Sequence, residues 1–265
     1  MPSPFRHAAV PMLLALALAG CGSGVELRPS ARLDALLPPD DVYPDGYLVQ
    51  TGDVAEIESE GSSSPDFDRV EPAECGAAME ESGSEQVPQG AAEGALQTAR
   101  PDGASGPTTS YSFILVTEDP SEDASDTGPQ VRMIDACSRF TGYVGDERME
   151  GRIRRLSQDD LPEGSDGFIM EFSGGGTDMS TQMAWGKASD VHFALLSVHV
   201  DDGSSSPSVP ELLDACRDEP REDGERPTTC YDNHRVQSEA IEELEREEEF
   251  AGIMASAARH LEEAA

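Results

Sequence analysis

The sequence predicts an α+β fold, an antiparallel β-sheet connected as a meander with helices packed on one side. Between residues 140 and 200, apolar residues recur at every second position and short glycine turns separate the runs, which is typical of antiparallel strands with one covered face. After residue 236 the spacing of apolar residues changes to that of an amphipathic helix. Four cysteines beyond residue 70 indicate two disulfides that hold the domain together.

Three short helices are expected in the first half of the chain. Leu33 to Leu37 precede two prolines, which end a helix. Pro72 to Glu81 begin with a proline at a first-turn position and continue with alanines and acids, so we expect Cys75 on a helix. From Val131 to Arg139 the apolar residues have helical spacing, which places Cys137 on the inward face.

The predicted strands begin with a compact β-run, Tyr111 to Thr117, and continue after residue 139. Phe140 to Val144 and Arg148 to Leu156 form a hairpin around Gly145-Asp146. The next strands share one apolar face, and Val191 to Val200 closes the set. That face carries Phe168, Met170 and Phe172, then Met179, Thr181, Met183 and Trp185.

The C-terminal segment predicts one long helix. Between Val236 and Leu261 the apolar residues form a helical stripe, and Glu239 to Glu249 supply an acidic outer face. Such a stripe has to be covered, so we expect the helix to pack on the apolar face of the meander. A partner helix is the alternative.

Cysteine usage indicates an oxidising compartment. Apart from Cys21, the cysteines are Cys75, Cys137, Cys216 and Cys230, an even number that allows three pairings. We favour Cys75 with Cys137 and Cys216 with Cys230, because local closure needs the least rearrangement. A zinc site is the weaker alternative, since no two cysteines have the close spacing that zinc sites use.

The N-terminus has the pattern of a lipoprotein signal peptide. A single Arg6 precedes an apolar run of about a dozen residues, which is too short to span a bilayer but suits a signal-peptide core. Leu18-Ala19-Gly20-Cys21 is similar to the lipobox of bacterial lipoproteins, in which the cysteine is lipidated with acyl chains such as palmitate. We therefore expect a signal peptide over residues 1–20, a lipidated tether over 21–30 and one domain with long acidic loops over 31–265. Its location would be the extracytoplasmic face of the cell membrane, and an ordinary secretory signal is the alternative.

The charge balance limits the partners. The chain has 53 acidic and 18 basic residues, a net charge of −35. Nucleic acids are excluded as partners, because binding them requires Lys and Arg to displace counterions. The acidic surface fits either cation binding or adaptation to a salty medium, and the sequence leaves both open.

Catalytic motifs are absent from the sequence. It contains no nucleophile elbow, phosphate-binding loop, dinucleotide fingerprint or zinc-protease helix, so we expect no enzyme, cofactor or metal site. His192 and His199 are an odd number of residues apart on one predicted strand and should point to opposite faces. Trp185, beside Lys187, is a candidate for the wall of a ligand cleft, with a core position as the more frequent alternative.

Several short motifs resemble an uncharacterised family of actinobacterial envelope lipoproteins, which are similar in turn to the extracellular sensor domain of mycobacterial receptor serine/threonine kinases. These are the lipobox, L-x-x-L-L-P at Leu33 to Pro38, P-x-E-C at Pro72 to Cys75, Cys137 to Phe140, and T-Q-x-A-W-G at Thr181 to Gly186. The resemblance implies a sheet flanked by helices, two disulfides and a cleft for an unknown ligand. Cys75 and Cys137 match the first disulfide of that domain, whereas Cys216 and Cys230 do not clearly match the second.

We therefore expect a lipid-anchored, non-catalytic, sensor-like envelope protein that binds a small ligand or a cell-wall fragment in a cleft between sheet and helices. An accessory or scaffold subunit, docking another envelope protein through its acidic face and C-terminal helix, is the second hypothesis. A hydrolase acting through two carboxylates is the third. A binder should show a pocket lined by apolar and aromatic residues, whereas a scaffold should show an exposed apolar stripe.

Overall fold

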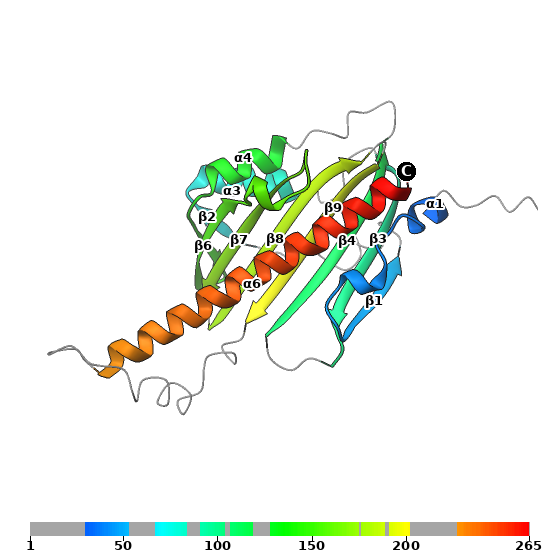
Figure 1. Ribbon diagram of the computed structural model, residues 1–265. Coiled ribbons are helices and arrows are strands. Elements are labelled where there is room, and N and C mark those ends of the chain that lie inside the picture. The colour runs from blue at the N-terminus through cyan, green and yellow to red at the C-terminus, as the bar shows by residue number, and fades with distance from the viewer. Residues whose placement is uncertain are drawn as a thin grey trace, which may run out of the picture.

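A computed structural model describes residues 30–52, 67–83, 91–103, 107–118, 128–174, 176–188, 191–201 and 227–264. These residues form one antiparallel sheet with the strand order β1-β3-β4-β9-β8-β7-β6-β5-β2. Figure 1 shows the sheet with the long helix α6 crossing it diagonally. The strands are β1 Tyr47–Gly52, β2 Arg69–Glu71, β3 Ala91–Pro101, β4 Thr108–Glu118, β5 Phe140–Val144, β6 Glu147–Arg155, β7 Asp166–Gly174, β8 Thr177–Ala188 and β9 Val191–Asp201. The helices are α1 Ser30–Asp34, α3 Ala73–Gly83, α4 Gly128–Ala136 and α6 Pro227–Ala264, with short 3₁₀ turns at Asp40–Val42 and Gln158–Asp160.

The predicted meander is confirmed. Strands β5 to β9 follow one another in sequence and in space, and all are antiparallel. Gly145 has φ of +60° in the β5–β6 turn, a backbone conformation that glycine adopts without steric cost. The sheet is larger than predicted, because β1, β2 and β3 extend it at both edges.

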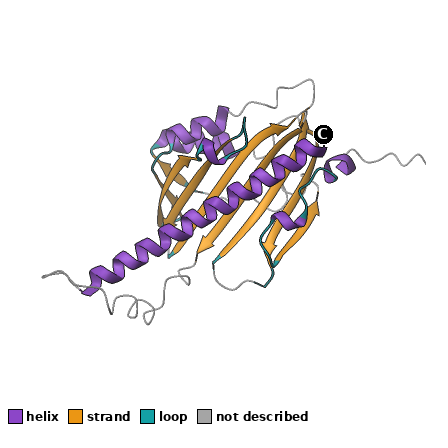
Figure 2. Ribbon diagram, in the orientation of Figure 1, coloured by secondary structure: helices purple, strands orange, loops and turns teal. Residues whose placement is uncertain are grey.

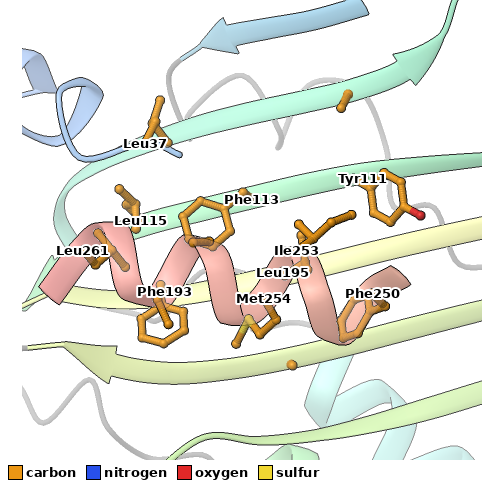
Figure 3. Packing of buried hydrophobic residues seen from close by; sticks show 14 of the residues in the cluster. Leu37, Tyr111, Phe113, Leu115, Phe193, Leu195, Phe250, Ile253, Met254 and Leu261 are labelled. Carbon is orange, nitrogen blue, oxygen red and sulfur yellow. The ribbon is translucent and has the colours of Figure 1, made fainter. Parts of the chain in front are cut away.

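Helix α6 covers one face of the sheet with its C-terminal half. Phe250, Ile253 and Met254 are buried and pack in one cluster with residues of β4 and β9, such as Phe113 and Leu195. Figure 3 shows these side chains between the helix and the strands. The prediction of a long amphipathic helix that covers the sheet is thus confirmed.

The face that α6 covers is not the one that the sequence pattern indicated. Phe168, Met170 and Phe172 pack in a second cluster together with residues of α3 and α4. Their neighbour Ile169, which points to the opposite face of β7, belongs to the cluster beneath α6. The prediction of helices on one side only was therefore wrong: both faces of the sheet carry helices. Figure 2 shows α6 crossing the near face.

One of the two predicted disulfides is confirmed. Cys75 in α3 is bonded to Cys137, which directly follows α4, with a Cα–Cα distance of 4.8 Å. Both cysteines are fully buried, so the bond closes the core beneath the two helices. The second predicted disulfide, Cys216 with Cys230, lies outside the described residues. The structure describes neither Cys216 nor the side chain of Cys230.

The predicted signal peptide, Cys21 and most of the tether also lie outside the described residues. In the part of the chain that is described, no helix has the length and apolar character required to cross a membrane.

Candidate functional site

The underside of α6 changes from apolar to polar toward the N-terminal half of the helix. Beneath that half lies a groove of about 680 Å³ between the helix and strands β2 and β5 to β9. Its helix wall is formed by Ser238, Glu242, Glu243 and Arg246. The groove begins where the apolar contacts of Phe250 end, so one helix both seals the core and roofs the groove.

The floor of the groove can be read from the strand register, because directly paired residues of an antiparallel sheet point to the same face. One line of paired residues, which we call the outer row, crosses six strands, and on β2, β5 and β6 a shorter line of Arg69, Tyr143 and Arg148 lies outside it on the same face. The outer row consists of Glu71, Thr141, Glu150, Ser173, Asp178 and Asp201, all of which line the groove. The outer row contains only carboxylates and hydroxyls.

The next line of paired residues inward, the middle row, carries charges of both signs. It pairs Arg152 with Glu171, Glu171 with Ser180, and Ser180 with His199. Arg152 donates hydrogen bonds to Glu171, and this contact raises the pKa of the guanidinium. Guanidinium groups therefore flank the outer row on both sides, since Arg148 also lies 2.8 Å from Glu150 and Arg69 lies 3.6 Å from Glu71.

The third line, the inner row, lies fully beneath α6. It runs from Arg154 through Ile169 and Gln182 to Ser197 and Tyr111. The Tyr111 hydroxyl donates a hydrogen bond to the Glu249 carboxylate of α6. Burial raises the pKa of Tyr111, and this hydrogen bond is the second largest cause of the increase. The Oε1 of Gln182, a residue only 4% exposed, has no hydrogen-bond partner among the described residues.

Ion pairs fix α6 above the floor. The Arg154 guanidinium lies 2.9 Å from Glu243 and also pairs with Glu247. Arg152 lies 3.5 Å from the same Glu243. These contacts are half-exposed, and such pairs contribute about 1 kcal/mol or less each, so they orient the helix more than they stabilise it.

His199 is neutral at physiological pH. Burial, followed by the nearby positive charge of Arg246, lowers its pKa to about 4. Its Nδ1 lies 3.0 Å from the Thr109 hydroxyl oxygen, which fixes the orientation of the ring. The other ring nitrogen, Nε2, therefore belongs to an uncharged imidazole and can take part in hydrogen bonds.

Other residues singled out in the sequence lie away from the groove. Trp185 lies on the opposite face, 6.1 Å from Phe168 between ring centroids, and packs against the cluster beneath α3 and α4. The core alternative for Trp185 is therefore confirmed. His192 pairs with Lys187 and points to the face opposite His199, as the odd spacing predicts.

The lining carries more charge than the expected apolar, aromatic pocket, although Phe140, Phe172 and Met179 also border the groove. Seven carboxylates and three guanidinium groups line the groove: Glu71, Glu150, Glu171, Asp178, Asp201, Glu242 and Glu243, with Arg139, Arg152 and Arg246. No motif in the sequence marks these residues, because the strand order brings them together. The alternation Asp178, Ser180, Gln182 was a signal of a polar second face on β8.

Comparison with known proteins assigns the chain to no family. No family model matches the chain, and no curated protein matches it at a significant level.

Proposed function

We propose that the chain is a lipid-anchored protein of the extracytoplasmic face of the cell membrane that holds a soluble polar ligand in the groove without transforming it. The observation that carries this proposal is the groove itself. A volume of about 680 Å³ is in the size range of small-molecule sites, and the walls present charged and hydroxyl groups from six strands and a helix. Surfaces that only stay solvated have no need of such a concave arrangement.

The location is supported by two features of different kinds. The lipobox-like Leu18-Ala19-Gly20-Cys21 predicts acylation and export. The buried disulfide Cys75–Cys137 is typical of proteins that fold in an oxidising compartment.

Binding without catalysis is supported by the state of the groove's ionisable groups. A catalytic carboxyl that donates a proton at neutral pH is usually held in an apolar, buried setting. The acids of the groove are exposed or half-buried, and Glu171 and Glu243 are paired with arginines. His199 is neutral, and its ring is oriented by the Thr109 hydroxyl, whereas a catalytic triad orients its histidine with a hydrogen-bonded carboxylate.

The test is to block the groove. Ser238→Trp places an indole on the helix wall, whereas Gln237→Trp places the same group on the exposed neighbouring position of the same helix. We expect a soluble ligand, found by thermal shift of the purified protein against sugars, peptides, amines and cell-wall fragments, to lose affinity with the first variant only. A ligand at a hundred times its Kd adds about 2.7 kcal/mol to stability, which is readily measured. A ligand whose affinity is unchanged by Ser238→Trp would place binding elsewhere and contradict the proposal.

A scaffold role is the second candidate, and the outer side of α6 favours it. Val236, Ile241 and Leu244 are 58%, 50% and 60% exposed, an apolar stripe on the half of the helix that roofs the groove. Leu244→Arg distinguishes the two functions, because it should leave ligand affinity unchanged but release a partner protein that co-purifies through this stripe. If Leu244→Arg releases a co-purifying partner and the unmodified protein binds no ligand, the scaffold function is favoured.

A further inference from the structure

The two edges of the sheet differ in how they are protected against a further strand. Edge strand β2 has three residues, of which Arg69 and Glu71 are charged, and Pro72 follows it directly. Short length, charge and proline are the devices with which proteins keep other chains from an edge. Edge strand β1, Tyr47–Gly52, has six residues and contains neither a charged residue nor a proline. One edge of the sheet is therefore blocked, and the other is suited to pairing.

The hydrogen bonds beside β1 show which of its main-chain groups face β3. The Asp102 N–H donates to the Gly46 carbonyl oxygen at 3.0 Å, so these two residues form a hydrogen-bonded pair. Such pairs alternate along an antiparallel ladder with pairs that are not hydrogen-bonded. Leu48 and Gln50 are two and four positions further along and therefore direct their N–H and C=O groups to β3.

The main-chain groups of Tyr47, Val49 and Thr51 consequently face away from β3. The Tyr47 N–H donates to the Pro44 carbonyl oxygen at 3.3 Å. Among the described strands, β1 pairs with β3 alone, so no partner strand reaches the N–H groups of Val49 and Thr51 or the carbonyl oxygens of all three residues. A further antiparallel strand can accept both N–H groups and donate to the three oxygens.

The side chains of this edge suit an apolar strand. Val49 is partly buried and packs against the core cluster beneath α6, so the core reaches its margin at β1. On the opposite face, Leu48 is 53% exposed. Two adjacent apolar residues, one opposite Val49 and the next opposite Leu48, would bury apolar surface on both faces of the sheet.

Charge favours a basic occupant over a second copy of the chain. The described residues of β1, β3 and the turns beside Gly46 include three acids, Asp45, Glu93 and Asp102, and one base, Arg100. Asp45 and Asp102 are exposed and lie at the same end of the edge, because Gly46 pairs with Asp102. A second copy brings a net charge of −35 and is repelled, whereas Lys or Arg on a partner is attracted.

We propose that the edge of β1 is the docking site of an extended segment from another protein, which joins the sheet as a further antiparallel strand. The segment carries two adjacent apolar residues opposite Val49 and Leu48, followed toward its C-terminus by Lys or Arg near Asp45. An antiparallel strand runs toward the start of β1, which fixes the end at which its basic residues lie. This interaction is separate from the groove and does not depend on what the groove binds.

The probe is the peptide Ac-Thr-Thr-Val-Ile-Thr-Lys-Lys-NH₂, measured by isothermal titration calorimetry on the purified protein at low ionic strength. Its Val and Ile are designed to lie opposite Val49 and Leu48. We expect a Kd below about 1 mM, weakened about threefold or more when both lysines are moved to the N-terminus and about tenfold or more when they are replaced by glutamates. Absence of binding at millimolar peptide, or equal affinity for the lysine and glutamate peptides, would overturn the proposal.

N-methylation of the peptide separates strand pairing from side-chain contacts. The N–H of its Val, opposite Val49, donates toward β1, whereas the N–H of the following Ile points away. Methylation of the Val nitrogen should weaken binding about tenfold or more, and methylation of the Ile nitrogen less than about threefold. Equal losses would show that no strand is added.

A matched pair of variants locates the peptide on the protein. Thr51→Pro removes an N–H that faces away from β3 and so spares the ladder, and Thr51→Val keeps that N–H. We expect about tenfold or more weaker binding for Thr51→Pro and a change within about twofold for Thr51→Val. Unchanged affinity in a folded Thr51→Pro variant would place the peptide elsewhere.

Amide hydrogen exchange tests the same site without a variant. In the free protein the N–H groups of Val49 and Thr51 should exchange faster than those of Leu48 and Gln50, and the peptide should slow the first two. Slow exchange of Val49 and Thr51 at every protein concentration would show that the chain itself covers the edge and would overturn the proposal. Slow exchange that is lost on dilution would make a second copy the occupant, and the proposal would be wrong.

Discussion

The two halves of α6 should respond differently to the same substitution, and the isoleucines at 253 and 241 offer a matched pair. Ile253 is 3% exposed in the core cluster, and Ile241 is 50% exposed above the groove. Ile→Ala removes three carbons, which at about 0.8 kcal/mol each is about 2.4 kcal/mol of transfer free energy when the site is buried. The cavity left at a packed site raises the total to about 3–4 kcal/mol.

At the exposed position the same change costs much less. About half of the transfer term applies, water fills the space, and alanine gains about 0.4 kcal/mol in helix propensity, so the net loss at Ile241 is below about 1 kcal/mol. Urea unfolding of the purified protein, followed by circular dichroism, measures both values when the variants keep the same dependence on urea. Equal losses would refute the division of α6 into a core half and a groove half, and a loss below about 1 kcal/mol at Ile253 would refute the docking of the helix on the sheet.

Four further results are expected. Replacing Cys75 and Cys137 by alanine should lower the free energy of unfolding by about 4 kcal/mol, because the disulfide closes a loop with a sequence separation of 62 residues; a change below about 1 kcal/mol in chemical denaturation would contradict this. The folded-state pKa of His199, about 4, lies below the ordinary value of 6.5, so its contribution to stability is complete above pH 6.5 and is lost as the pH falls toward 4. A His199 imidazole resonance, assigned by its loss in His199→Gln, that titrates near pH 6.5 in NMR spectra would disprove this lowered pKa. His199→Gln should also flatten the stability profile between pH 4 and 6.5. With a net charge of −35, the melting temperature should rise between low and molar NaCl, and a constant melting temperature would show that self-repulsion is unimportant. Cys21→Ala should abolish incorporation of a labelled fatty acid and release the protein from the membrane fraction; unchanged labelling would argue against the lipobox.

The sequence was informative where structure depends on local periodicity. Phe168, Met170 and Phe172 lie at every second position of a compact run, and this pattern located β7 and one of its apolar faces correctly. The same pattern led to the wrong prediction that the C-terminal helix covers that face, which packs instead against α3 and α4. Ile169 and Leu195 belong to the second face, where small residues such as Ala184 interrupt the apolar signal, so the surface beneath α6 is less evident in the sequence.

The groove was beyond local inference for a different reason. Glu71, Glu150 and Asp201 lie far apart in the chain and meet only because β2 pairs with β5 and the meander returns to β9. Single acids in a chain with 53 of them carry no signal of their own. The disulfide was easier, because few cysteines restrict the pairings and the helix that carries Cys75 could be recognised from its proline and alanines.

The place where the chain enters the fold gives the domain a direction. Leu33 of α1 and Leu261 near the end of α6 belong to the same cluster, and Figure 1 shows α1 beside the C-terminus. Ser238, which lines the groove, is 23 residues before Leu261, about 35 Å away along the helix axis at 1.5 Å per residue. If Cys21 is acylated as proposed, the groove thus lies at the end of α6 remote from the point where the tether joins the domain.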